Sequence, residues 1–353
     1  CSTQHQLKLK QESFLEQVQS KLGYLPDIIH EPIVHDAWHY RRKARLSVRY
    51  VAKKEKILIG FRERSTNWVV DTNECPILPK RVMVYMNELA ILLADMSIRS
   101  DIPQLELACG DEVDCIVIRH LSPLSTADKE QLITFAKTHL IWLMTQAKHP
   151  YDSLKLWPND EQYYLTYDLK DQNLRYCFHP HDFIQVNAHV NQSCVNLMLE
   201  WACLSRNDMV LDLFCGLGNF TLPMALHAHS VHGYELSDEM VTRARHNANL
   251  NQLDNVTFYA TDLDAIDHDK WLHHSHYDVV LIDPPRSGAK AVIPTLLRIQ
   301  PKTIIYISCH WPSMLRDIEL LSPVYKIEKL CCMDMFSQTY HIETMVKLVK
   351  QDS

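Results

Sequence analysis

Residues 210–225 read VLDLFCGLGNFTLPMA. An apolar strand pattern leads directly to Gly216 and Gly218, and an apolar helix pattern follows them. Glycine lets the backbone turn sharply and approach a ligand closely, because it has no Cβ atom. A strand, a glycine-containing turn and a helix form the ligand-binding first unit of many open α/β sheets. This stretch therefore predicts an α/β fold with a ligand at its first turn.

The chain after about residue 180 alternates between strand and helix patterns. The expected strands cover 209–215, 230–236, 255–261, 277–283 and 302–309, with helices between them and two late strands near 325–335 and 341–350. This alternation predicts a mainly parallel, doubly wound (Rossmann-like) sheet that binds ligands at the carboxyl ends of its strands.

The first 180 residues have a different pattern. Helices are expected near 10–22 and 79–96, and hairpins at 39–64 and 162–178. Because 353 residues exceed what a single core usually serves, two domains are expected. We predict an α+β domain over residues 1–180, followed by the doubly wound domain over 181–353.

Basic residues are concentrated in the first hairpin, although the net charge of the chain is -7. Residues 39–64 contain ten Lys or Arg against two Glu. Alternation places several of them on one strand face, including Arg41, Arg42 and Arg45. Such a face is either an RNA-binding surface or an ordinary solvated surface.

Composition excludes some other classes of protein. The chain has no apolar run near the roughly 18 residues of a membrane span, and its polar N-terminal residues do not form a signal peptide. Its eleven cysteines follow no disulfide framework, which favours reduced thiols. We expect a cytoplasmic protein that has no membrane association and no evident obligate protein partner.

Acidic residues lie at the ends of two of the expected strands and directly after a third. Glu235 comes nineteen residues after Gly216, where a carboxylate can accept both hydroxyls of a ribose. The turn lacks the third glycine of the dinucleotide fingerprint, which favours a nucleoside without a pyrophosphate. Asp262 is either an adenine-binding acid or a helix cap. Asp283 opens the rigid DPPRSG loop, either as part of a ligand site or as a structural turn.

The motifs DLFCGLGNFTLPMA, DPPRSGA, IYISC and DMF…HIETMV resemble those of the bacterial RNA (uracil-5-)-methyltransferases, most closely the iron–sulfur enzymes that act on 23S ribosomal RNA. The similarity extends through HDFIQVNAHVNQ, YRRKARLSVRY and ECPIL, so it covers nearly the whole chain. It implies a class I methyltransferase domain, a 23S ribosomal RNA partner and S-adenosylmethionine as cofactor. The implied cofactor contacts are Gln185, Phe214, Asn219, Glu235, Asp262 and Asp283.

The resemblance also changes the interpretation of two residues. Cys309 by itself is typical of a buried strand residue, and Glu343 by itself of an exposed edge strand. In the family chemistry, a thiolate adds to carbon 6 of uracil so that carbon 5 can attack a methyl group. A base then removes the carbon 5 proton. The match implies that Cys309 is the nucleophile and Glu343 the base.

Departures from the family pattern leave other functions open. His310 and Trp311 stand where the family usually has Asn-Pro, and Gln338 and Tyr340 where it tends to have His and Gly. A transfer-RNA uracil-5-methyltransferase is one alternative. A catalytically impaired RNA-binding or ribosome-assembly factor is another. An amino-methylating enzyme is disfavoured, because Arg286 follows the DPP motif where an aromatic residue would hold the base. The sequence does not identify the target uridine.

A metal cluster is also implied by the resemblance. Cys1, Gln4 and His5 match the end of the family's Cys-x-x-Cys-x-x-Gln-His pattern, and Cys75 matches its distant fourth cysteine. A [4Fe–4S] cluster takes four thiolates, and this chain supplies two. We therefore expect the chain to be a fragment of a longer protein that binds the cluster. The alternative is that Cys1 and Cys75 are unrelated thiols.

Overall fold

The computed structural model describes residues 2–351, apart from 64–65, 67, 71–73 and 266–270. The chain forms two compact units. Unit 1 consists of Cys1–Ala37, Leu169–Tyr176 and Asn187–Ser353, and unit 2 of Trp38–Asp168 and Cys177–Val186.

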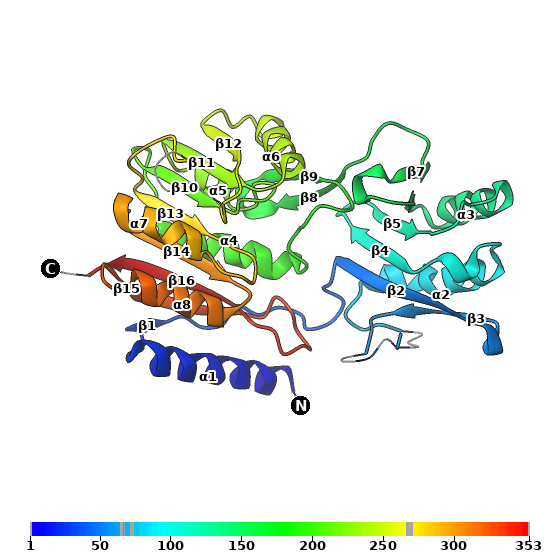
Figure 1. Cartoon of the computed structure of the whole chain (residues 1–353), viewed down its shortest axis with the longest axis horizontal. Coiled ribbons are helices and arrows are strands. Elements are labelled where there is room, and N and C mark those ends of the chain that lie inside the picture. The colour runs from blue at the N-terminus through cyan, green and yellow to red at the C-terminus, as the bar shows by residue number, and fades with distance from the viewer. Residues whose placement is uncertain (1, 64–65, 67, 71–73, 266–270, 352–353) are drawn as a thin grey trace. The chain divides into compact units, whose positions relative to one another are not determined.

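Unit 1 is built on an eight-stranded sheet (Figure 1) with the strand order β1-β15-β16-β14-β13-β10-β11-β12. The strands are β1 (Ile28–Ile29), β10 (Met209–Leu213), β11 (Ser230–Glu235), β12 (Val256–Ala260), β13 (Val279–Ile282), β14 (Thr303–Ser308), β15 (Tyr325–Met333) and β16 (Glu343–Lys350). Strands β10 to β14 are parallel, and β16 is antiparallel to both neighbours. The predicted doubly wound class is confirmed. The winding reverses between β10 and β13, where such sheets bind ligands.

Six α-helices accompany this sheet in the described part of unit 1. They are α1 (Thr3–Leu22), α4 (Ala188–Ala202), α5 (Thr221–Ala225), α6 (Asp238–Leu250), α7 (Ile293–Ile299) and α8 (Trp311–Leu321). Helices α1, α7 and α8 contribute to one apolar core cluster with the strands. Strand β13 (VVLI) is buried throughout, as expected of a parallel strand covered on both faces.

The N-terminal segment belongs to unit 1, which differs from the predicted boundary near residue 180. Helix α1 buries Phe14 and Val18 in the unit 1 core. Strand β1 then pairs in parallel with β15, with Ile28 opposite Lys329. Figure 1 shows α1 and β1 beside the β15 side of the sheet. These contacts join residues 1–37 to a core made almost entirely by the C-terminal half.

Unit 2 contains a six-stranded sheet with the order β3-β2-β4-β5-β6-β7. Its elements are β2 (Lys43–Val51), β3 (Lys56–Gly60), α2 (Lys80–Asp95), β4 (Gln104–Cys109), β5 (Asp114–Arg119), α3 (Thr126–His139), β6 (Trp142–Gln146) and β7 (Leu154–Trp157). Helices α2 and α3 share an apolar core with alternate residues of β2, namely Ala44, Leu46 and Val48. The predicted basic hairpin is confirmed as β2 and β3.

A second predicted hairpin is confirmed as β8 (Leu165–Leu169) and β9 (Leu174–Phe178), and the chain passes between the two units within it. Across the described ranges, the helices are all too short or too polar to span a membrane.

Candidate active site

The turn after β10 has the backbone that its glycines were expected to allow. Phe214, Gly216 and Gly218 have positive φ values of 65°, 56° and 94°. A Cβ atom at Gly218 would lie 3.3 Å from Cγ of Leu222, so a side chain there would be both strained and crowded. The N–H of Gly218 donates to the carbonyl of Cys215 at 3.0 Å. The result is a tight turn with little side-chain bulk.

Glu235, at the end of β11, lies against this turn. Its Oε2 accepts a hydrogen bond from the N–H of Gly216 at 3.1 Å, and its Oε1 accepts one from the N–H of Ser237 at 3.1 Å. Each carboxylate oxygen has a second lone pair. The half-buried carboxylate can therefore still accept hydrogen bonds from a ligand's hydroxyl groups.

Asn219 is fixed by a residue that the sequence did not indicate. Its Nδ2 donates to Oδ1 of Asn191 at 2.9 Å, and Nδ2 of Asn191 donates to Oδ1 of Asn219 at 2.9 Å. Asn191 lies on α4 and is 1% exposed. This reciprocal amide pair ties α4 to the glycine turn.

Strand register brings Cys309, Glu343 and Asp283 to one edge of the sheet. Strands β14 and β16 are antiparallel, with Ser308 opposite Thr344. The next residues in this register are Cys309 and Glu343. Asp283 directly follows β13, the parallel neighbour of β14. A thiol and two carboxyl groups from distant parts of the sequence thus meet at the carboxyl edge of the parallel strands.

The pKa values of these three groups are shifted in the same direction. Burial raises the pKa of Glu343 to about 8, with a further contribution from the charge of Asp283. Burial raises the pKa of Asp283 to about 7. Burial also raises the pKa of the Cys309 thiol, as do the charges of Glu343 and Asp283, whereas Arg286 opposes that rise. A cationic ligand here would favour the ionised form of all three groups. Such convergence of shifted groups is typical of functional sites.

The loop that carries Asp283 and Arg286 is held by α8. Buried Asp317 accepts hydrogen bonds from the N–H of Ala289 at 2.7 Å and from the hydroxyl of Tyr306 at 2.8 Å. Oγ of Ser313 lies 3.0 Å from the carbonyl oxygen of Arg286. Helix α8 starts two residues after Cys309, so one helix supports both the loop and the end of β14.

Two other acidic residues lie at the same end of the sheet. Asp262 is exposed, and its Oδ1 accepts a hydrogen bond from the N–H of Asp264 at 3.0 Å. It belongs to a turn, because no helix begins in the described residues 261–265. Asp212 is buried and accepts a hydrogen bond from Thr221 Oγ1 at 2.5 Å. Burial raises the pKa of Asp212 to about 8, with contributions from Asp283 and Glu235.

The remaining predicted cofactor residue and the predicted RNA contacts lie in unit 2. Gln185 is buried, and its carbonyl accepts a hydrogen bond from Nε of Arg42 at 2.8 Å. Arg42 is 6% exposed and stacks over the ring of Tyr167 at 4.4 Å. Its expected role as a phosphate contact is therefore corrected, since the guanidinium is enclosed. Arg41 is half-buried, and the Arg45 side chain is 71% exposed.

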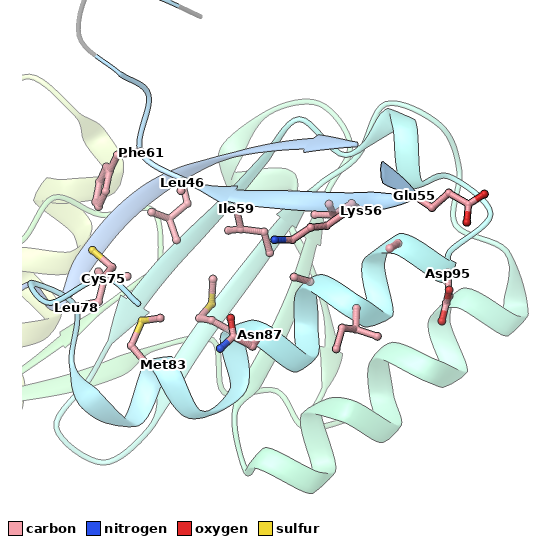
Figure 2. A pocket seen from close by; sticks show the side chains of 16 residues that line it. Leu46, Glu55, Lys56, Ile59, Phe61, Cys75, Leu78, Met83, Asn87 and Asp95 are labelled. Carbon is pink, nitrogen blue, oxygen red and sulfur yellow. The ribbon is translucent and has the colours of Figure 1, made fainter. Parts of the chain in front are cut away.

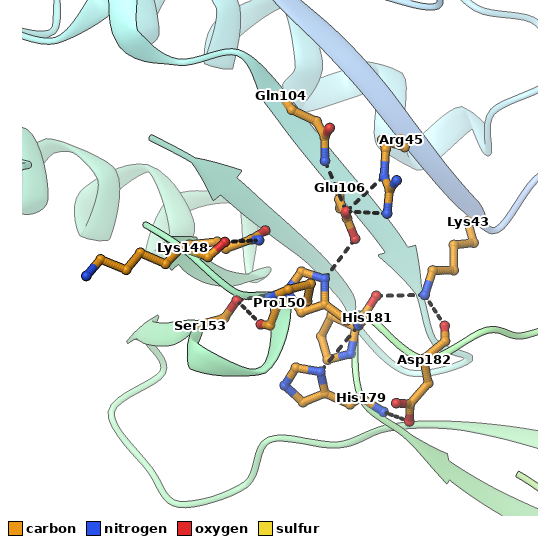
Figure 3. Close-up of polar contacts among 12 residues, drawn as sticks. Lys43, Arg45, Gln104, Glu106, Lys148, Pro150, Ser153, His179, His181 and Asp182 are labelled. Carbon is orange, nitrogen blue, oxygen red and sulfur yellow. Dashed lines mark hydrogen bonds and ion pairs between the residues drawn. The ribbon is translucent and has the colours of Figure 1, made fainter. Parts of the chain in front are cut away.

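Figure 3 shows the polar contacts that join β2 to residues 179–182, shortly before Gln185. Arg45 pairs with buried Glu106 at 3.0 Å, and Glu106 also contacts Nδ1 of His181 at 2.9 Å. Nε2 of His181 lies 2.8 Å from Oγ of Ser153. Lys43 donates to the carbonyl of Pro180 at 2.8 Å, and burial lowers the pKa of Lys43 to about 8. Lys43 is therefore a structural residue.

A model of the tRNA (uracil-5-)-methyltransferase family matches residues 3–351. The chain belongs to this family. The prediction made from the motifs is confirmed: the protein is an S-adenosylmethionine-dependent RNA (uracil-5-)-methyltransferase.

Family members with similar sequences include bacterial ribosomal RNA enzymes. The chain is 41% identical to the 23S rRNA (uracil(1939)-C(5))-methyltransferase RlmD of Hahella chejuensis, over 99% of this chain and 81% of that protein. It is 37% identical to RlmD of Legionella pneumophila strain Lens, over the same shares. The Pyrococcus abyssi tRNA (uracil-54, C5)-methyltransferase, solved with S-adenosyl-L-homocysteine, matches with a TM-score of 0.72 at 20% identity, over 99% of this chain and 84% of that chain. That likeness supports the fold.

Three residues of this methyltransferase's site were not predicted, namely Asn191, Asp212 and Asp317. Each is a polar side chain at most 1% exposed. Asp212 interrupts the apolar run VLDLF. Because acidic residues are rarely buried inside a strand, this position could have been predicted to belong to a functional site. Asn191 and Asp317 lie on helices whose positions depend on the tertiary fold, so the sequence held no comparable signal for them.

Of the two predicted metal ligands, the structure describes only Cys75. Cys1 lies outside the described residues. Cys75 lies with Phe61, Leu78 and Met83 in the wall of a mostly apolar cavity in unit 2 (Figure 2). The volume of this cavity is about 340 Å³. In the described part of the chain, no three His, Cys, Asp or Glu side chains are placed to hold one metal ion. The described residues therefore do not fit an iron–sulfur cluster by themselves.

Proposed function

We propose that this enzyme methylates carbon 5 of a uridine in 23S ribosomal RNA. The similarity to RlmD proteins along nearly the whole chain supports this RNA as the substrate. The observation that carries the chemistry is the meeting of Cys309, Glu343 and Asp283 at one sheet edge. Because ribosomal RNA is the substrate and all ten described cysteines are free thiols, we place its action in the cytoplasm.

The residues around the glycine turn fit S-adenosylmethionine. The turn at Gly216 and Gly218 leaves room for a ligand beside the backbone, and Glu235 has lone pairs for ribose hydroxyls. Phe214, Asn219, Asp262 and Gln185 complete the proposed contacts. S-adenosylmethionine supplies a methyl group on a positively charged sulfonium.

In the proposed reaction, the Cys309 thiolate bonds to carbon 6 of uracil and breaks the carbon 5–carbon 6 double bond. The electron pair passes to carbon 5 as an enolate, which takes the methyl group. Glu343 then accepts the proton of carbon 5, and the carbon 6–sulfur bond breaks to restore the double bond and the thiolate. The positive charge of a bound S-adenosylmethionine would favour the Cys309 thiolate that the first step needs and the Glu343 carboxylate that the second step needs.

Unit 2 is proposed to bind RNA through the exposed side of its basic hairpin. Arg45, Arg49, Lys53 and Lys54 are exposed on β2 and the turn that follows it. Phosphate contacts of this kind position an RNA without reading its sequence.

Trapping with 5-fluorouridine RNA tests the nucleophile, because fluorine cannot leave carbon 5 as a proton. The wild type with S-adenosylmethionine should form a covalent protein–RNA adduct, and Cys309→Ala should form none. Methylation of unmodified 23S ribosomal RNA should fall to background in this variant, while cofactor affinity stays near normal. Cys203→Ala, which removes an exposed thiol elsewhere in unit 1, is the matched control. An undiminished adduct in Cys309→Ala would exclude Cys309.

The same assay separates the two alternative functions. Methylation of unmodified transfer RNA in preference to 23S ribosomal RNA would favour a transfer-RNA enzyme. Tight RNA binding with neither methylation nor adduct would favour an impaired RNA-binding factor.

The iron–sulfur cluster remains a prediction, and no step of the reaction is assigned to it. A protein that carries this chain together with the family's complete Cys-x-x-Cys-x-x-Gln-His pattern should, when purified without air, contain about four irons per chain and lose them on Cys75→Ser. Such a protein that methylates RNA but contains no iron would exclude the cluster. The present chain should bind iron poorly, since it supplies only two of the expected thiolates.

A further inference from the structure

The loop that joins β15 to β16 leads directly to the proposed base. Tyr340 lies in this loop, three residues before Glu343, and its side chain is 69% exposed. Single exposed apolar residues are common on protein surfaces. Tyr340 differs from such residues in how its loop is held and in what lies beside its ring.

Helix α1 anchors this loop at two points. Lys10 pairs with Asp334 at 2.8 Å, and their side chains are only 9% and 4% exposed. Nε2 of Gln6 donates to Oε1 of Gln338 at 3.0 Å, and Gln338 has a left-handed backbone with a φ of 65°. These two contacts hold the loop at Asp334 and at Gln338, two residues before Tyr340.

A row of side chains runs from Tyr340 through His341 to Arg286, in the loop that carries Asp283. The rings of Tyr340 and His341 have centroids 4.1 Å apart and an interplanar angle of 35°. Nη2 of Arg286 lies 3.4 Å from Nδ1 and 3.3 Å from Nε2 of the His341 ring. Arg286 in turn acts on the Cys309 thiol, whose pKa its charge lowers against the effect of burial. The exposed ring of Tyr340 is therefore the outer end of a row of side chains that also contains a histidine and a cationic arginine.

This arrangement suits a nucleobase. Unpaired bases stack on aromatic side chains and on arginine planes in RNA-binding proteins. Arg286 would also attract the negatively charged RNA backbone. We propose that Tyr340, supported by His341 and Arg286, is a platform on which an unpaired base next to the reacting uridine stacks. The inference rests on the proposed function.

The test compares Tyr340→Ala with Tyr340→Phe on unmodified 23S ribosomal RNA made by transcription. Loss of one stacked base should raise the Kd and the KM for RNA about tenfold in Tyr340→Ala, with a much smaller effect on kcat. Tyr340→Phe keeps the ring and should restore both constants to within about twofold of the wild type. Leu250→Ala removes exposed apolar area from α6 of the same unit and should change neither constant. Unchanged affinity for S-adenosylmethionine verifies folding.

A second RNA identifies the partner of the ring. This RNA has abasic sites in place of the nucleotides that flank the reacting uridine. The wild type and Tyr340→Ala should bind it with equal affinity, because the stacking partner of the ring is already absent. Equal affinity of wild type and Tyr340→Ala for the unmodified RNA would overturn the inference, as would a full effect of Tyr340→Ala on the abasic RNA. If the wild type methylates neither RNA, the proposed function fails first and this platform fails with it.

Discussion

The charge of the proposed base opposes ionisation of the proposed nucleophile. Above about pH 8 Glu343 is ionised, and its negative charge then opposes formation of the Cys309 thiolate. Burial and the charges of Glu343 and Asp283 together favour the unreactive thiol form of Cys309 in the free enzyme. The positive sulfonium of the methyl donor would reverse this preference, so the thiolate would form mainly when a methyl group is available.

Glu343→Gln should therefore lower the pKa of Cys309 relative to the wild type. The substitution removes one of the charges that raise this pKa, while burial and Asp283 remain. Alkylation of Cys309 by iodoacetamide, followed by mass spectrometry across pH 7–10, should begin at lower pH in the variant. With unmodified RNA and cofactor, the same variant should accumulate a methylated covalent adduct, because elimination needs the base.

Exposed Cys203 provides an internal control for this titration, and its alkylation profile should be the same in both proteins. An unchanged Cys309 profile would mean that Glu343 does not influence the thiol. Full turnover without adduct would assign the base to another residue.

At the scale of elements, the strands of unit 1 could be predicted because their apolar runs are continuous and bounded by glycine or acidic residues. Strands β13 and β14 lie within one or two residues of the predicted bounds. The order of the strands could not be predicted, because apolar runs such as VVLI and TIIYIS do not specify their neighbours. Glu343 illustrates this limit: alone it suggests an edge strand, whereas β16 lies between β14 and β15 and buries it.

Helix α1 shows why the domain boundary differed from the prediction. Its twenty residues bury only Phe14 and Val18, so its sequence contains little information about its packing partner.

The burial of Arg42, in contrast, could have been predicted from the sequence. Arg42 lies two residues before Ala44, in phase with the buried positions Ala44 and Leu46 of β2. Successive residues of a strand point to opposite faces of the sheet, so this alternation distinguishes the enclosed Arg42 from the exposed Arg45. A count of basic residues along the hairpin does not make that distinction.

At the scale of the whole molecule, an acidic protein has to bind a polyanion. A net charge of -7 disfavours this, so the local charge of the β2–β3 hairpin in unit 2 has to supply the attraction. Since Arg42 and Lys43 are enclosed, the prediction applies to the exposed residues Arg45 and Arg49.

Replacing Arg45 and Arg49 together by serine should weaken RNA binding and flatten its dependence on salt. Each phosphate contact contributes roughly 0.7–0.9 to the slope of log K against log salt, so two lost contacts should reduce the slope by about 1.4–1.8. Affinity for S-adenosylmethionine should not change. The control is the double variant Lys326→Ser with Lys350→Ser, which removes the same charge from unit 1. These lysines lie at the end of the β15–β16 pair away from Glu343, and their loss should leave the slope unchanged. If both double variants have the wild-type slope, the hairpin is a solvated surface and RNA is bound elsewhere. If both lower the slope equally, the enzyme attracts RNA through its net charge and not through this hairpin.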